Sequence, residues 1–149
     1  MILDDILQAV VDAVQATTPE DDDGAPAQFA ELAAGDLAET GQDRNFVVES
    51  LRIADREWTG TPGYAERTVE LDLRIKYINE GRSRRRALCL VAQDGQRLQD
   101  TVVAAVRGVP GVGAFDSNGL AAINDGDDPS VVYLVIPYVC EYTDEIVVN

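Results

Sequence analysis

The sequence predicts a single α+β domain, residues 1–149, in which a mostly antiparallel sheet carries two main helices on one face. Three observations predict this. The length of 149 residues is the commonest size for one domain. Hydrophobic residues make up 46% and charged residues 26%, which is ordinary globular composition. Segments with a hydrophobic period of two lie between helical segments without regular strand-helix-strand alternation, which favours α+β over α/β.

The first predicted element is a short amphipathic helix that starts at Ile2. Its apolar side chains recur at helical spacing up to Val14, and acids and glutamines occupy the other side. Residues 17–26 contain proline, glycine and four consecutive acids, so we expect a mobile acidic loop. Residues 27–40 favour a weak helix interrupted by Gly35. Residues 17–45 together therefore form an insert of acidic loop and weak helix.

The hydrophobic period changes to two after this insert. Residues 46–55 and 66–78 are predicted strands, and the second alternates so regularly that one face is expected to be buried and the other wet. The connection between them is a long hairpin loop that carries Trp58 and Tyr64. These aromatic residues either pack against their own strands or anchor a partner.

A long helix is predicted for residues 83–107. Ser83 is a suitable cap, and Gly108 and Pro110 end the helix. The next segment is rich in turns, with a short strand near Leu120. The chain closes on a long apolar strand, 129–146, in which Pro137 favours a sheet edge or a bulge.

The predicted core brings the second strand and the closing strand of the sheet against the long helix. From the strands we expect Leu71, Leu73, Ile75, Leu134 and Ile136, and from the helix Leu88, Val91, Leu98 and Val102.

Motifs for catalysis are missing from the sequence. It has no histidine, which excludes histidine-dependent triads and histidine zinc sites. Its two cysteines, Cys89 and Cys140, lie in apolar stretches, and its only lysine, Lys76, lies in a strand rather than in a phosphate-binding loop. We therefore predict no catalytic residue, no cofactor and no metal. Two of the 27 acids could still meet as a catalytic pair, so an unrecognised enzyme stays a third possibility.

The net charge of −15 is unevenly distributed. Residues 79–107 hold six bases and three acids, whereas residues 108–149 hold seven acids and no base. Such a charge repels phosphate backbones and anionic lipids, which argues against sequence-specific nucleic-acid binding and against membranes. The acids either only keep the protein in solution or form a wall that DNA passes without adhering. The amino-terminal sequence MILDDILQAV lacks the positive charge of a secretory signal, so we expect assembly in the cytoplasm.

Four arginines crowd the start of the long helix: Arg82, Arg84, Arg85 and Arg86. The positive end of the helix dipole lies at the same place, so these charges reduce local stability. They are either solvated or paired with an acidic surface of a neighbouring copy. Together with Trp58 and Tyr64 they are the predicted subunit interface.

The order of these elements resembles that of the tail-terminator and neck proteins of long-tailed bacteriophages. Those proteins join the head to the tail or complete the tail. The resemblance lies in the helix ILDDILQAVVDAV, the strand ERTVELDLRIKYI, the arginine-led helix SRRRALCLVAQDGQRLQDTV and the closing strand VVYLVIPYVCEY. It covers most of residues 1–16 and 46–143, and the acidic insert departs from it. The resemblance implies a non-catalytic subunit of a ring, typically a hexamer, that caps the tail tube.

The resemblance also implies the partners of this protein, which are copies of itself, the tail tube protein and the head-tail connector proteins. It implies that DNA passes through the lumen of the ring and that the protein is located in the tail or neck of the virion. The alternative is a cytosolic α+β binding or regulatory module without catalysis.

Overall fold

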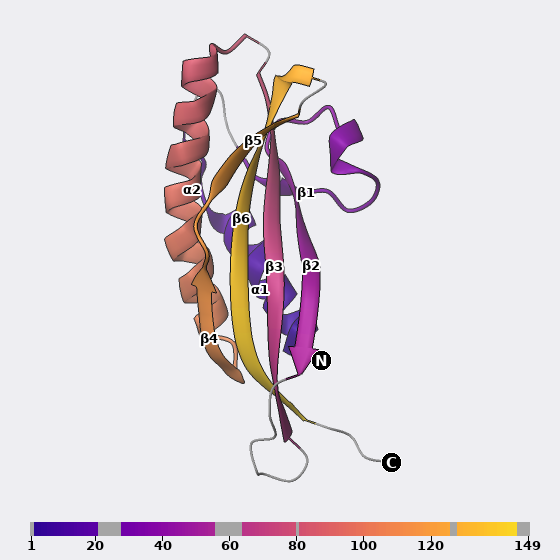
Figure 1. Ribbon diagram of the computed structural model, residues 1–149. Coiled ribbons are helices and arrows are strands. Elements are labelled where there is room, and N and C mark those ends of the chain that lie inside the picture. The colour runs from indigo at the N-terminus through magenta and orange to yellow at the C-terminus, as the bar shows by residue number, and fades with distance from the viewer. Residues whose placement is uncertain (1, 21–27, 56–63, 80, 126–127, 146–149) are drawn as a thin grey trace.

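The chain folds as a six-stranded sheet with both helices behind one of its faces (Figure 1). The computed structural model describes residues 2–20, 28–55, 64–79, 81–125 and 128–145. The strands follow the order β1-β2-β3-β6-β4, and β5 pairs with another part of β6. All pairings are antiparallel except that of β1 with β2. The predicted α+β class with a mostly antiparallel sheet is confirmed.

Two long strands form the centre of the sheet. β3 (Tyr64–Ile78) pairs with β6 (Asp128–Glu145) over its whole length, and with β2 (Asn45–Asp55) on its other side. The alternation predicted for β3 is confirmed for its buried face, because its odd-numbered residues from Val69 to Tyr77 are buried. On the face that was expected to be wet, Lys76 is buried as well.

The core lies between this sheet and the two helices, α1 (Ile2–Ala16) and α2 (Arg84–Arg107). Most predicted core residues are confirmed, including Leu73, Leu98 and Leu134, each fully buried. Leu88 was predicted wrongly, since it is 43% exposed and Leu90 is buried in its place. The neighbouring Ala87 and Val91 are buried as well, so the apolar stripe runs through Leu90 and leaves Leu88 outside.

The segment after α2 contains a strand that the sequence did not indicate. β4 (Val112–Ser117) pairs with the carboxyl-terminal half of β6, and β5 (Ala121–Asp125) pairs with the other half near the predicted short strand.

Pro137 was predicted to lie at a sheet edge or a bulge. The sheet edge is wrong, because β6 is an interior strand. Pro137 lies opposite Asp72 of β3, in a regular register. On its other side β4 ends opposite Tyr138, and β5 begins only opposite Val135. The carbonyl of Pro137 accepts a hydrogen bond from the Asn118 amide there, at 2.8 Å. In a strand the nitrogen of a residue points to the same side as its carbonyl, so the missing N–H falls at the break between β4 and β5.

Residues 27–40 do not form the predicted weak helix in their described part. They contain the two-residue strand β1 (Ala30–Glu31) and the 3-10 turn η1 (Leu37–Glu39), which lies over the sheet face away from the helices (Figure 1). Lys76 of β3 holds this segment, because its buried ammonium donates to the carbonyls of Ala38 at 2.6 Å and Thr40 at 2.8 Å. Contacts from a distant strand therefore outweigh the weak local helix propensity.

Candidate interaction surfaces

The amino-terminal end of α2 begins as the sequence predicts. The Ser83 hydroxyl accepts a hydrogen bond from the Arg86 amide at 3.1 Å, which caps the helix. Arg84 and Arg85 are exposed, and Arg86 is half-buried.

The structure separates Arg82 from the other predicted interface arginines. Its guanidinium binds the Asp43 carboxylate at 2.8 and 3.2 Å and the Ile78 carbonyl at 3.1 Å. Asp43 also accepts from the Ile78 amide, so the ion pair ties the start of α2 to the end of the sheet. Arg82 therefore has a structural role within the chain.

The structure does not describe the side chain of either aromatic member of the predicted interface. Trp58 lies outside the described residues. Tyr64 begins β3 opposite Glu145, and only its backbone is described.

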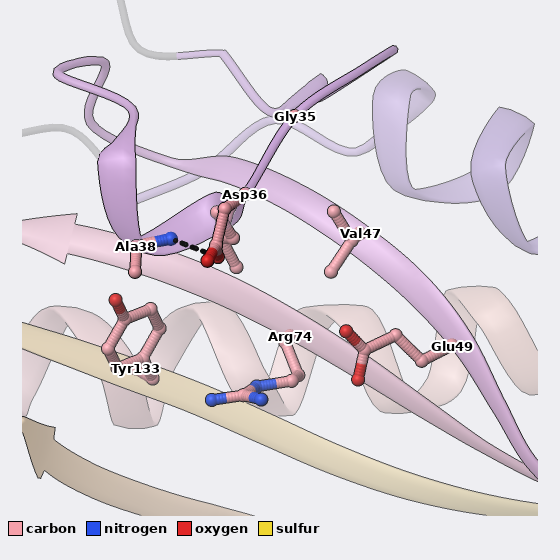
Figure 2. Close-up of a pocket in the computed structure, with 8 residues that line it drawn as sticks. Gly35, Asp36, Ala38, Val47, Glu49, Arg74 and Tyr133 are labelled. Atoms are coloured by element: carbon pink, nitrogen blue, oxygen red, sulfur yellow. Dashed lines mark hydrogen bonds between the residues drawn. The ribbon is translucent and has the colours of Figure 1, made fainter.

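A hollow of about 460 Å³ opens on the sheet face away from the helices (Figure 2). Its wall is the segment 35–38, and its floor comes from three strands: Val47 and Glu49 of β2, Arg74 of β3 and Tyr133 of β6. The Arg74 and Glu49 side chains point into the same space below Asp36.

Arg74 is the central cation of this hollow. Its guanidinium carbon lies 5.3 Å from the centroid of the Tyr133 ring, within cation-π distance. Its Nε is buried without a hydrogen-bond partner, and Arg74 forms no ion pair with any residue in the described ranges. The guanidinium therefore keeps unused donors.

Two carboxylates flank Arg74. Glu49 lies directly opposite Asp72 across the β2–β3 ladder, on the same open face. The pKa of Asp72 is raised by its partial burial and by the negative charges of Glu49 and Glu70, which outweigh Arg74. Like charges directly opposite in a ladder are destabilising, so this pair reduces the stability of the isolated chain.

A second polar cluster lies on the helix side of the sheet, and it was not predicted from the sequence. Asp94 of α2 is fully buried and forms an ion pair with Arg44 at 3.1 Å. It also accepts hydrogen bonds from the Tyr77 hydroxyl and the Glu20 amide, both at 2.6 Å. Because all these groups are occupied by one another, we assign the cluster to folding, where it anchors the start of the acidic loop. An isolated aspartate among apolar helix residues was its only signal.

The cysteines and acids of the described ranges form no further cluster of this kind. Both cysteines are free thiols, with Cys140 buried as expected and Cys89 exposed. No three metal-binding side chains gather within the described ranges. None of the helices described is long and apolar enough to cross a membrane.

Two comparisons with known sequences gave no match. No protein-family model matches the chain. No curated protein sequence matches it either.

Proposed function

We propose that the protein is a structural subunit of a tailed-phage particle, a tail terminator that assembles into a ring, caps the tail tube and joins it to the neck. The observation that carries this proposal is the one-sided construction of the sheet. The helices cover one face. Among the described residues, the segment around η1 is what covers the other face, and Val135, Pro137 and Val139 are partly exposed between charged side chains. A broad, rigid and mixed surface of this kind suits contact with another protein.

The charges agree with a ring. Exposed arginines at the start of α2 and acids on the open sheet face lie on different surfaces of the molecule, as a head-to-tail interface requires. The net charge of −15 suits a lumen through which DNA moves without adhering. The partners of the ring are the tail tube protein and the head-tail connector proteins.

Size-exclusion chromatography with light scattering tests the ring. The expected result is a closed species of defined size, such as a hexamer. The fraction of chains in this species should increase with protein concentration. Adding purified tail tubes should then deplete this species from solution by end-binding, which electron microscopy would resolve. A chain that remains monomeric at high concentration and binds no tails contradicts the proposal.

The second candidate is a binding or regulatory module, and the hollow beside Arg74 favours it. An open site with one unpaired guanidinium and one aromatic ring can hold a small polar ligand. Native mass spectrometry of the chain purified from its host distinguishes the two. A retained small molecule that Arg74→Ala releases favours the module.

A further inference from the structure

We propose that the open sheet face receives the start of α2 from a neighbouring copy, with Arg84 and Arg85 of one chain pairing with Glu49 and Asp72 of the next. This assignment rests on the proposed self-assembly and names the two surfaces that meet.

The acceptor surface carries more negative charge than the folded chain compensates, because among the described residues Arg74 alone lies beside the two carboxylates. Glu49 and Asp72 face each other across the ladder, and neither forms an ion pair or a hydrogen bond with any other described residue. Arg52 lies opposite Glu70, one step further along the same face, so that pair is balanced. The unbalanced pair is therefore Glu49 with Asp72.

The donor surface is unbalanced in the opposite sense. Arg84 and Arg85 are exposed on the first turn of α2, and neither has a hydrogen-bond or ion-pair partner among the described side chains. The amino-terminal end of a helix favours acids, so two cations at the start of α2 oppose the helix dipole. A neighbouring carboxylate pair would remove the cost at both surfaces.

The two surfaces cannot meet within one chain. The helices pack on one face of the sheet (Figure 1). Glu49 and Asp72 lie on the other face, so the sheet itself separates them from the start of α2. A contact between two different surfaces on two copies is heterologous, and repeated by rotation it closes a ring.

The hollow decides where the incoming arginines dock. Arg74 lies between Tyr133 and Glu49 and repels another guanidinium on its Tyr133 side, whereas Glu49 marks the opposite end of the hollow (Figure 2). The stem of an arginine can lie along Val47 while its head reaches the carboxylates. The Glu49 end of the hollow is thus the expected docking position.

A charge-swap experiment tests the pairing. The acceptor is reversed in Glu49→Arg with Asp72→Arg, and the donor in Arg84→Glu with Arg85→Glu. Each reversed chain alone places like charges at the contact, so we expect the concentration needed for assembly to rise at least tenfold. Mixing the two reversed chains restores opposite charges at every contact of an alternating ring, and the chain with all four substitutions restores them in itself. Both should assemble again near the wild-type concentration.

Matched controls separate this contact from charge in general. Asp100→Arg and Arg107→Glu make the same changes of charge at exposed positions of α2, although Arg107, unlike Arg84 and Arg85, is ion-paired with Asp116 of its own chain. Both variants should leave assembly within about twofold of wild type. Thermal unfolding of every variant, followed by circular dichroism, verifies that the chains are folded.

The outcomes separate this assignment from the proposed function. If the wild type forms rings and the reversed chains assemble equally well, the arginine contact is wrong and the ring stands. If the reversed chains are folded but neither the mixture nor the fourfold variant recovers, the loss has another cause and the pairing is also wrong. If the wild type never assembles, the proposed function itself fails.

Discussion

Asp94 is a fully buried charged side chain, and its environment explains how the fold accommodates it. The carboxylate faces the Arg44 guanidinium, the Tyr77 hydroxyl and the Glu20 amide, so each oxygen has a hydrogen-bond partner. Arg44 adopts a positive φ of 60°, which residues other than glycine rarely do. The cluster evidently outweighs that backbone strain. Burial and the adjacent Asp94 charge hold the pKa of Tyr77 well above its usual range, so its hydroxyl remains a donor.

Replacing Asp94 should therefore destabilise the protein strongly. In Asp94→Ala the Arg44 charge stays buried without its partner, and the expected loss in the free energy of unfolding is about 3 to 5 kcal/mol. Urea denaturation measures it. Asp100→Ala removes an exposed acid from the same helix and should cost no more than about 0.5 kcal/mol. Equal effects of the two substitutions would show that the buried pair contributes nothing specific.

Replacing Asp72 should have the opposite effect on the free energy of unfolding. Its folded-state pKa lies above its ordinary value of 3.8, so the folded chain binds the proton more tightly than the unfolded chain. The penalty is therefore absent below pH 3.8 and develops as the pH rises through the folded-state pKa. Asp72→Asn should stabilise the monomer at neutral pH by about 0.2 to 1 kcal/mol, the range of cross-strand pairs, and the gain should vanish in acid. Thermal melts of monomeric protein at several pH values give the comparison. A variant that is less stable than wild type at pH 7 contradicts this account.

At the scale of elements, the sequence predicted best where one face of an element is buried and the other is wet. The alternation over residues 66–78 and the capped stripe over residues 83–107 both match the structure closely, because local periodicity follows directly from burial. The short strand β4 was missed, since its six residues lie among glycines and gain stability from pairing with β6 and from packing against α2, contacts that the local sequence does not show.

Other errors came from contacts between residues distant in the sequence. Residues 27–40 have helix-forming composition, yet pairing with β2 and the ammonium of Lys76 hold them over the sheet. Pro137 suggested a sheet edge, and only the break between β4 and β5 explains its interior position. Local sequence patterns carry no information about either contact.

The burial of side chains on β3 and α2 makes a direct prediction about the core. Leu73 is fully buried, so Leu73→Ala should reduce the free energy of unfolding by about 2 to 5 kcal/mol. Leu88→Ala is the matched control, because Leu88 is 43% exposed and alanine favours helix. Its effect should stay within about 0.5 kcal/mol. A large loss from Leu88→Ala would indicate that the stripe is assigned to the wrong side of the helix.

Lys76 should control the order of the segment that walls the hollow. Lys76→Met removes the two hydrogen bonds to Ala38 and Thr40 and leaves those carbonyls without a partner, at an expected cost of about 1 to 3 kcal/mol. Hydrogen exchange should show faster exchange at the Glu39 and Thr40 amides, which bond within the turn. Amides in the centre of β3 and β6 serve as the internal reference. Unchanged protection at residues 39 and 40 would mean that packing around Leu37 holds the segment alone.

At the scale of the whole molecule, the sequence located the arginine cluster but not the roles of its members. The pairing of Arg82 with Asp43 joins residues 39 positions apart, and no local pattern reveals it. The acceptor surface was equally hidden, because Glu49 and Asp72 become neighbours only through the register of β2 and β3. Segment charges show that opposite charges exist, whereas the fold shows on which faces they lie.

The salt dependence of assembly should distinguish the proposed contact of Arg84 and Arg85 from the general repulsion between copies. Each chain carries a net charge of −15, and this repulsion is relieved by salt, so total assembly alone does not report on the arginine pairs. The informative quantity is the difference between wild type and Arg84→Gln with Arg85→Gln. At about 0.1 M salt charges act over about 10 Å, and at about 1 M over only about 3 Å. The assembly advantage of the wild type should therefore be largest at low salt and shrink steadily as salt is added. Arg107→Gln is the control, because it also makes the chain more negative while the ion pair that it removes, with Asp116, lies within the chain. This variant should show no such salt-dependent difference in assembly. Light scattering at matched concentrations measures all three chains. A wild-type advantage that is the same at both salt concentrations would mean that Arg84 and Arg85 contribute packing area rather than charge to the interface.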